Sequence, residues 1–150
     1  PGGPSATTVP SDTPTSVMTD TPVATATSTT CPLQFTDVPV DSPFYTYIRC
    51  LACRGIVSGY STGCETGNPC FNPGNNVTRG QVAKIVSNSA GFEDAPGAQL
   101  FQDVTPASTF YDFVQRIANR GYISGYPCGG PGEQCVSGNL HYFPPATAVT

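Results

Sequence analysis

The stretch FTDVPVDSPFYTYIRCLACRGIVSGY, at residues 35–60, occurs a second time as FQDVTPASTFYDFVQRIANRGYISGY at residues 101–126. The two copies align without a gap. A second block also recurs, as FNPGNNVT at residues 71–78 and FPPATAVT at residues 143–150. One supersecondary unit rarely buries its own apolar face, and neighbouring copies supply the cover. The repeat therefore favours a stacked surface module over a single catalytic pocket.

Each copy predicts a helix that is followed by a long loop. Two sets of apolar residues have the i, i+3, i+4, i+7 spacing of one helical face: Phe44, Tyr47, Ile48 and Leu51, and then Phe110, Phe113, Val114 and Ile117. Ser42 and Ser108 are the expected N-caps. Gly55 and Gly121 are expected just past the helix ends, where a left-handed backbone is common.

A second helix is predicted to begin at Thr78, because Thr78-Arg79-Gly80-Gln81 fits a capping box. Gly91 is expected to end this helix. The second copy stops at the matching cap, Thr150. Either the protein continues, or another subunit covers the apolar face of residues 110–117.

Seven cysteines indicate an oxidising compartment. Cys64 and Cys70 flank one loop, and Cys128 and Cys135 flank the matching loop of the second copy. We expect a local disulfide in each, with a stabilisation of roughly 2–3 kcal/mol from loop closure.

Three cysteines remain, and we expect Cys31 to pair with either Cys50 or Cys53, which would tie the preceding segment to the first helix. The Cys50-x-x-Cys53 spacing, with Cys64 and Cys70 downstream, also has some zinc-ribbon character. The second copy keeps its loop pair without any C-x-x-C, so disulfides are preferred and no metal site is predicted.

Composition separates residues 1–30 from the rest, and the repeat divides the rest into a first motif at residues 31–100 and a second at residues 101–150, which lacks its second helix. The first segment has no aromatic or basic residue and cannot bury enough apolar surface to offset the entropy of ordering it. It is predicted to be an extended linker or stalk, either unmodified or O-glycosylated. The candidate acceptors are its ten threonines: Thr7, Thr8, Thr13, Thr15, Thr19, Thr21, Thr25, Thr27, Thr29 and Thr30.

The net charge of −4, with few and scattered arginines, argues against a nucleic-acid partner. No apolar stretch is long enough for a transmembrane segment. His141 is the only histidine, and no catalytic triad, paired-carboxylate site or phosphate-binding glycine motif accompanies it. We therefore expect no enzyme activity and no cofactor.

In order and spacing, these elements resemble S-layer homology motifs, whose pattern runs Phe-x-Asp-Val, an aromatic-led helix, Gly-Ile/Val-x-x-Gly, Phe-x-Pro and Thr-Arg-Ala-Glu. The first copy matches at Phe35, Asp37, Val38, Ile48, Leu51, Gly55, Ile56, Gly59, Phe71, Pro73, Thr78 and Arg79. The second copy matches at Phe101, Asp103, Val104, Gly121, Gly125, Phe143, Pro145 and Thr150.

The resemblance implies a mainly α fold of tandem helix-loop-helix motifs, here with long disulfide-flanked irregular loops and a preceding linker. In that family three motifs surround a pseudo-threefold axis, and the module holds secreted proteins on the cell envelope, often through a pyruvylated polysaccharide. The implied function is therefore an extracellular, cell-surface module that binds an anionic envelope polysaccharide. The alternative is a self-assembling structural subunit of an S-layer or filament, with copies of itself as neighbours.

The candidate binding residues are Thr78, Arg79, Gly80 and Gln81, at the start of the second helix. A basic residue opposes the helix dipole there, and glycine lowers helix propensity by about 1 kcal/mol relative to alanine. Both make sense if an anion approaches free N–H groups beside a guanidinium. The alternative is that Arg79 pairs with Asp37 or Asp103 and fixes one motif against the next.

Asp37 and Asp103 are further candidates for contact with sugar hydroxyls. The preferred interpretation is that each caps a turn before the first helix of its copy. Tyr60 and Tyr126 could stack on sugar rings, but a core position is favoured for both.

Overall fold

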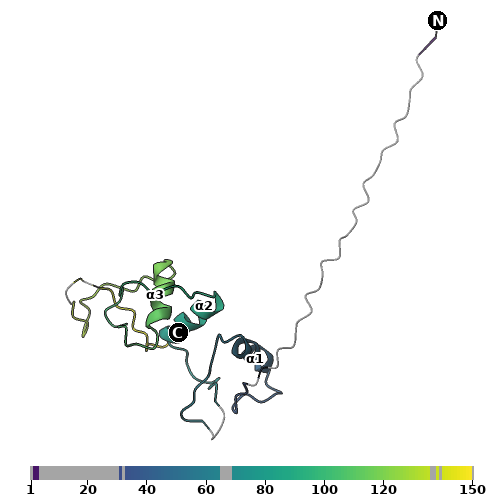
Figure 1. Cartoon of the computed structure of the whole chain (residues 1–150), viewed down its shortest axis with the longest axis horizontal. Coiled ribbons are helices and arrows are strands. Elements are labelled where there is room, and N and C mark those ends of the chain that lie inside the picture. Colours follow the sequence, from purple (N-terminus) through teal and green to yellow (C-terminus); the bar gives the residue numbers. More distant parts are fainter. Residues whose placement is uncertain are drawn as a thin grey trace. The chain divides into compact units, whose positions relative to one another are not determined.

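The structure is a computed structural model, and it describes residues 2–3, 31, 33–64, 69–135, 138 and 140–149. The chain divides into two parts, Pro1–Thr30 and Cys31–Thr150, of which the second contains all the helices described below (Figure 1). The ten candidate O-glycosylation threonines and the proposed linker around them lie outside the described residues.

Three helices form in the described part of the chain: α1 at Tyr45–Cys53, α2 at Arg79–Ser89 and α3 at Tyr111–Asn119. The remaining described backbone is loop, with isolated bridges in place of strands. The described fold is therefore helical and irregular, as expected.

The glycines Gly55, Gly91 and Gly121 follow the three helices with φ of 70°, 66° and 74°. After α1, for example, the N–H of Ile56 reaches back to the carbonyl of Leu51 at 3.0 Å, which closes a Schellman motif. The predicted helix ends are confirmed at these residues.

The predicted N-caps Ser42 and Ser108 are wrong by two residues. Phe44 and Phe110 occupy the cap positions of α1 and α3, without a side-chain cap. Each serine hydroxyl instead accepts from the N–H of the following phenylalanine, at 3.3 and 3.2 Å. The carbonyl of each serine also accepts from the N–H of the first helical residue. Each serine therefore stabilises a turn that leads into the helix and does not cap the helix itself.

The two copies repeat their local geometry. Phe35 and Phe71 pack with ring centroids 5.4 Å apart, and Phe101 and Phe143 repeat this pair at the same distance. A Cβ atom on Gly125 would lie 2.6 Å from the Phe101 ring and 2.5 Å from a carbonyl oxygen, and Gly59 is equally crowded by Phe35. Glycine is needed at both positions because its φ is positive and the phenylalanine lies directly against it.

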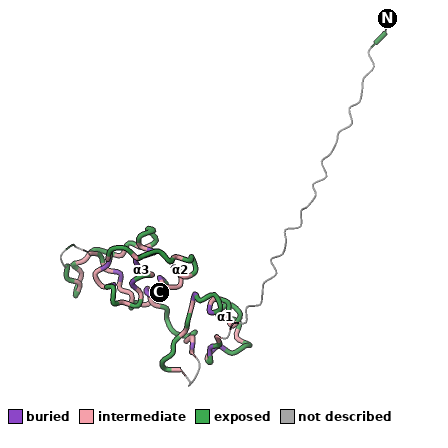
Figure 2. The backbone as a smooth tube through the Cα atoms, in the orientation of Figure 1, coloured by how far each residue is buried: buried purple, intermediate pink, exposed green. Residues whose placement is uncertain are grey.

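The apolar core is larger around α3 than around α1. The cluster at α3 consists of Ala83, Phe101, Val104, Tyr111, Val114, Ile117 and Phe143. The cluster at α1 consists of Phe35, Val38, Ile48 and Ala52. Figure 2 marks these buried residues along the chain.

Helices α2 and α3 pack against each other, whereas α1 packs against neither of them. At this contact a Cβ on Gly80 would lie 2.6 Å from the Phe110 ring, and the Lys84 ammonium lies 5.7 Å from the centre of the Phe113 ring. The expectation that residues 110–117 leave an apolar face uncovered is therefore wrong. The second helix of the first copy covers the first helix of the second copy.

The uncovered face lies on α1 instead. Phe44 and Tyr47, the counterparts of Phe110 and Phe113, are 62% and 70% exposed. Only Ile48 and Ala52 of α1 are buried. The apolar spacing predicted the helix correctly, but it did not predict which helix has a partner.

Three disulfides are present, between Cys31 and Cys53, Cys64 and Cys70, and Cys128 and Cys135. Of the two partners left open for Cys31, the structure has Cys53, and Cys50 is free and exposed. Three of the four cysteines in the zinc alternative are thus held in disulfides. Within the described ranges, no cluster of three or more His, Cys, Asp or Glu side chains could hold a metal.

Candidate functional site

A pocket of about 270 Å³ opens between the loops of the first copy, the first turns of α2 and the start of α3. Its apolar wall includes Ile56, Val57, Phe71, Ile85 and Phe110. Its polar groups are supplied by Ser58, Tyr60, Asn72, Asn75, Asn76, Gln81, Lys84 and Thr109. A mainly apolar concavity with a few polar groups is the usual form of a small-ligand site.

Among the described residues that line the pocket, one carries a positive charge and none carries a carboxylate. Lys84 is the only lysine in the chain, and the chain as a whole carries a net charge of −4. Tyr60 is 39% exposed, and its hydroxyl accepts a short hydrogen bond from the amide nitrogen of Gln81. The expectation that Tyr60 is a core residue is therefore wrong.

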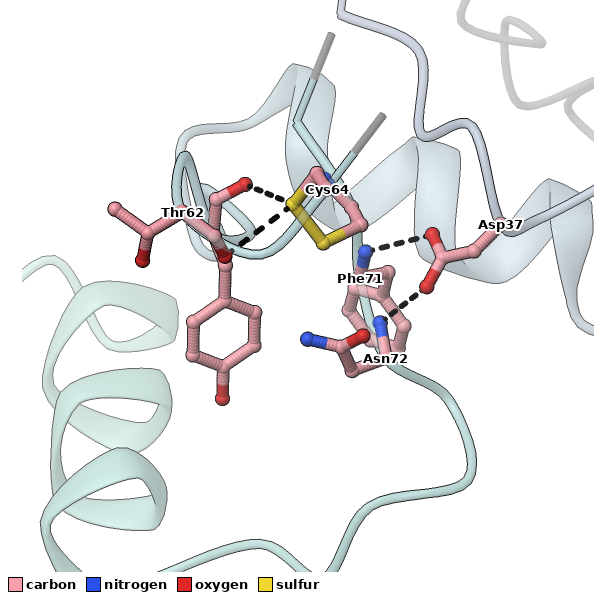
Figure 3. Close-up of a disulfide and its surroundings, with 7 residues drawn as sticks. Asp37, Thr62, Cys64, Phe71 and Asn72 are labelled. Atoms are coloured by element: carbon pink, nitrogen blue, oxygen red, sulfur yellow. Dashed lines mark hydrogen bonds between the residues drawn. A yellow bond between two sulfur atoms is a disulfide. The ribbon is translucent and has the colours of Figure 1, made fainter. Parts of the chain in front are cut away.

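Asn72, which also lines the pocket, has a left-handed backbone with φ of 58°. Asparagine tolerates this left-handed region better than most residues. Its N–H donates to Asp37 Oδ2 at 2.6 Å, and the N–H of Phe71 donates to Oδ1 at 2.7 Å. Figure 3 shows this carboxylate beside the disulfide of Cys64. Asp37 thus holds the segment that carries Asn72 to the pocket.

The preferred interpretation of Asp37 and Asp103 as caps of a local turn is wrong. Asp103 Oδ1 accepts from the N–H of Phe143 at 2.9 Å, as Asp37 does from Phe71. Each carboxylate therefore joins the beginning of its copy to the distant Phe-x-Pro segment of the same copy. Neither lines the pocket.

The capping box at the start of α2 is present as predicted. The Thr78 hydroxyl accepts from the N–H of Gln81 at 3.3 Å, and the Gln81 side chain accepts from the N–H of Thr78 at 2.8 Å. Gln81 therefore has two roles, because its amide oxygen caps the helix while its amide nitrogen faces Tyr60.

The expectation of free N–H groups at Arg79 and Gly80 is wrong. The N–H of Arg79 donates to the carbonyl of Thr147, and that of Gly80 donates to the carbonyl of Pro145, each at 2.9 Å. The segment before Val149 thus supplies the acceptors that an incoming anion would have supplied. Gly80 makes room for the Phe110 ring rather than for a ligand.

The Arg79 side chain faces the second copy. Its Nε donates to the carbonyl of Phe143 at 2.7 Å, and its guanidinium lies 4.6 Å from the centre of the Phe143 ring. Neither Asp37 nor Asp103 forms an ion pair with it among the described residues, so the expected partner is wrong. The expected role, fixing one motif against the next, is filled through Phe143 instead. The two terminal nitrogens of Arg79 make no bond to a described residue.

Tyr126, the counterpart of Tyr60, is also exposed, at 38%. Its hydroxyl donates to the Glu133 carboxylate, and this bond, with some burial, raises the pKa of Tyr126 to about 12. The core position favoured for it is therefore wrong. Its environment differs from that of Tyr60 because an acidic group has replaced an amide.

Of the six predicted candidates, only Gln81 lines the pocket. Sequence reasoning gave no role to Lys84, although its uniqueness in the chain was a usable signal. None of the helices in the described ranges is long and apolar enough to cross a membrane.

Comparison with known protein families gave one match. The sequence profile of the S-layer homology domain matches residues 34–83, which include α1, the pocket loops and the first turns of α2. No curated protein and no solved structure gave a significant match. Residues 34–83 therefore resemble the S-layer homology domain, a family of cell-surface anchoring modules.

Proposed function

We propose that this domain holds the chain on the cell envelope by binding an anionic polysaccharide in the pocket beside α2. The module is non-catalytic, is extracellular and needs no cofactor. Residues 101–150 act as a second motif, and residues 1–30 act as the linker that carries it. The observation that carries the proposal is the pocket itself, which combines the only lysine with exposed amide and tyrosine groups in an acidic protein.

Each pocket group suits one part of an acidic sugar. The Lys84 ammonium pairs with a carboxylate, and a hydrogen bond between charged groups is about twice as strong as a neutral one. The exposed Tyr60 ring offers a flat surface to a sugar ring, and the amides of Asn72 and Gln81 match its hydroxyls. The apolar wall at Phe110 excludes water, which strengthens the pairing with Lys84.

Arg79 has a second place in this proposal. Its Nε and its N–H hold the second copy, so the terminal nitrogens, which bond to no described residue, are the part that meets a polymer. We therefore expect Arg79 to act at the edge of the site, and Lys84 to act inside it.

The test measures co-sedimentation of the purified chain with isolated cell-wall sacculi, before and after chemical extraction of their secondary polymer, with a control without wall. We expect binding that is lost on extraction. Lys84→Gln should weaken binding about tenfold, or about 1.4 kcal/mol. The matched control is Arg54→Gln, which removes one positive charge from an exposed position after α1.

Equal loss in Lys84→Gln and Arg54→Gln would indicate general charge attraction and would contradict the pocket. If only Arg79→Ala lost binding to the sacculi, while α2 and α3 stayed protected from hydrogen exchange, the binding site would be at the Arg79 guanidinium and not in the pocket. Binding to extracted sacculi would contradict the polysaccharide as the ligand.

A further inference from the structure

The loop that follows Tyr126 carries a carboxylate that the first copy lacks. Tyr126 and Phe143 are 17 positions apart, whereas Tyr60 and Phe71 are 11 apart, so the loop of the second copy has six more residues. Glu133 lies in this longer loop, and its carboxylate accepts from the hydroxyl of Tyr126. In the first copy the hydroxyl of Tyr60 instead meets an amide. The acidic group is therefore particular to the second copy.

Short-range bonds hold Glu133 in place. The Cys128–Cys135 disulfide closes the loop around it. Inside that closure the N–H of Gly129 donates to the carbonyl of Glu133 at 2.8 Å, and the N–H of Glu133 donates to the carbonyl of Gly130 at 2.9 Å. The carboxylate is therefore presented by a closed turn, so a ligand that binds it has little backbone left to order.

Two tyrosine rings lie beside this carboxylate. Tyr126 and Tyr142 exchange backbone hydrogen bonds of 3.0 and 2.9 Å, and their rings are nearly parallel, with centres 6.2 Å apart. The first copy has Cys70, which is held in a disulfide, opposite Tyr60. The Tyr142 hydroxyl accepts from the Gln102 amide at 2.8 Å, which fixes its ring. The ring pair is therefore also particular to the second copy.

Tyr126 would stay accessible beside a helix equivalent to α2. Tyr60 is followed by α2, and its hydroxyl contacts that helix at Gln81, yet it is 39% exposed. Tyr126 is 38% exposed, and its own hydroxyl already bonds to Glu133. A helix at the corresponding place in the second copy would therefore leave a similar share of the Tyr126 ring open to a ligand.

The charges around Tyr126 favour a cation. One Glu133 oxygen accepts from Tyr126, and the other accepts no hydrogen bond from a described residue. The bond to Glu133, some burial and the nearby carboxylate charges raise the pKa of Tyr126, and the Arg79 guanidinium lowers it by a smaller amount. A cation at this place gains both from the carboxylate and from the face of a tyrosine ring.

We propose that Tyr126, Tyr142 and Glu133 form a second binding site, which takes an amino sugar whose amine is protonated. The pyranose ring lies on the exposed ring of Tyr126, and its ammonium group pairs with the second oxygen of Glu133. The site is separate from the Lys84 pocket, because none of its three residues lines that pocket. The two copies thus select sugar units of opposite charge.

The test measures binding of the purified 150-residue chain to chitosan oligosaccharides, which carry free amines, and to their N-acetylated forms, by calorimetry under conditions that protonate the amines. We expect binding of the amine form to be about tenfold tighter. Glu133→Gln keeps an acceptor for Tyr126 but removes the charge, so it should weaken this binding about tenfold. The matched control is Glu93→Gln, which removes one acid from an exposed position after α2 and should change little.

A second variant tests the ring. Tyr126→Leu should weaken binding of the amine form about tenfold, because the sugar loses its stacking surface. The matched control is Tyr122→Leu, at a residue that is 65% exposed and lies beyond the end of α3. Protection of the α3 amides from hydrogen exchange checks that each variant is folded.

Several results would overturn the proposal. Equal affinity for the amine and N-acetylated forms, or no binding of the amine form, would exclude recognition of an ammonium group. Equal loss in Glu133→Gln and Glu93→Gln would indicate general attraction of a polycation to an acidic chain. Unchanged binding in Tyr126→Leu would mean that no sugar lies on this ring.

Discussion

Helices α1 and α3 share one sequence pattern but are held in place by different means. Helix α3 packs on α2, and four of its residues, including Gln115, are buried. Helix α1 buries two residues, and the Cys31–Cys53 disulfide fixes its C-terminal end. The spacing of apolar residues therefore defines a helical face, whereas the neighbouring element decides whether that face is buried.

The two regions should therefore respond differently to the same kind of damage. A small apolar cluster cannot by itself outweigh the entropy of ordering its chain, and a covalent closure compensates by restricting the unfolded state. A larger core does not depend on such a closure. We expect α1 to be sensitive to reduction and α3 to be sensitive to loss of packing.

The largest expected effect comes from opening the Cys31–Cys53 disulfide. Serine at both positions, in a Cys50→Ser background, should lower the stability of the α1 region by about 3 kcal/mol, because the two residues are 22 positions apart and the released loop regains entropy. Amide hydrogen exchange should show lost protection in α1 while α3 keeps its own.

The matched control opens the Cys128–Cys135 disulfide in the same background. These residues are only 7 positions apart, so the expected loss is about 2 kcal/mol and is confined to their own loop. If α3 amides lost protection together with those of α1, the two regions would form one cooperative unit and the contrast between them would fail.

A smaller effect is expected from removing one aromatic ring at equivalent positions. Phe110→Ala should cost about 2–3 kcal/mol, less than the roughly 3–5 kcal/mol of a fully buried phenylalanine, because Phe110 is partly buried against Gly80. Phe44→Ala should stay within about 0.5 kcal/mol. Urea unfolding of both variants in the Cys50→Ser background measures the difference, and equal costs would show that α1 has a cover.

The smallest effect concerns the two equivalent tyrosines. Tyr60 bonds to an amide, whereas the Glu133 carboxylate raises the pKa of Tyr126 to about 12. A raised pKa means that the bond stabilises the fold below the unfolded value of about 10 and that this contribution is lost as the pH rises through about 12.

Absorbance at 295 nm, compared between the native chain and Tyr126→Phe, isolates this titration. Glu133→Gln should return the midpoint toward the ordinary tyrosine value. If the titration midpoint of Tyr126 were the same in Glu133→Gln as in the native chain, the assigned hydrogen bond to Glu133 would be contradicted.

Features set by near neighbours in sequence could be predicted. The capping box at Thr78 and the glycines at the helix ends depend on residues within one turn, and their geometry is as expected. Ser42 and Ser108 were misplaced because a serine before an aromatic residue can serve a preceding turn as well as a helix.

Features set by distant residues could not be predicted. The bond from Asp37 to Phe71 spans 34 positions, and that from Arg79 to Phe143 spans 64. The free N–H groups expected at Arg79 and Gly80 are absent for this reason, since a helix start that looks unsatisfied in sequence can receive carbonyls from anywhere in the chain. Lys84 was missed because a helix pattern does not show which of its polar side chains faces a pocket.

The acceptors of the first α2 N–H groups also have a consequence for biosynthesis. The carbonyls of Pro145 and Thr147 accept from those groups. Because these residues follow α2 by more than 50 positions, α2 leaves the ribosome well before they do. At ordinary elongation rates the delay is on the order of several seconds. During that interval water must solvate the helix start, and the first copy completes its fold only after the second has been translated. In a fusion protein that contains only residues 31–100, the first N–H groups of α2 would therefore lack their protein acceptors and would remain bonded to water.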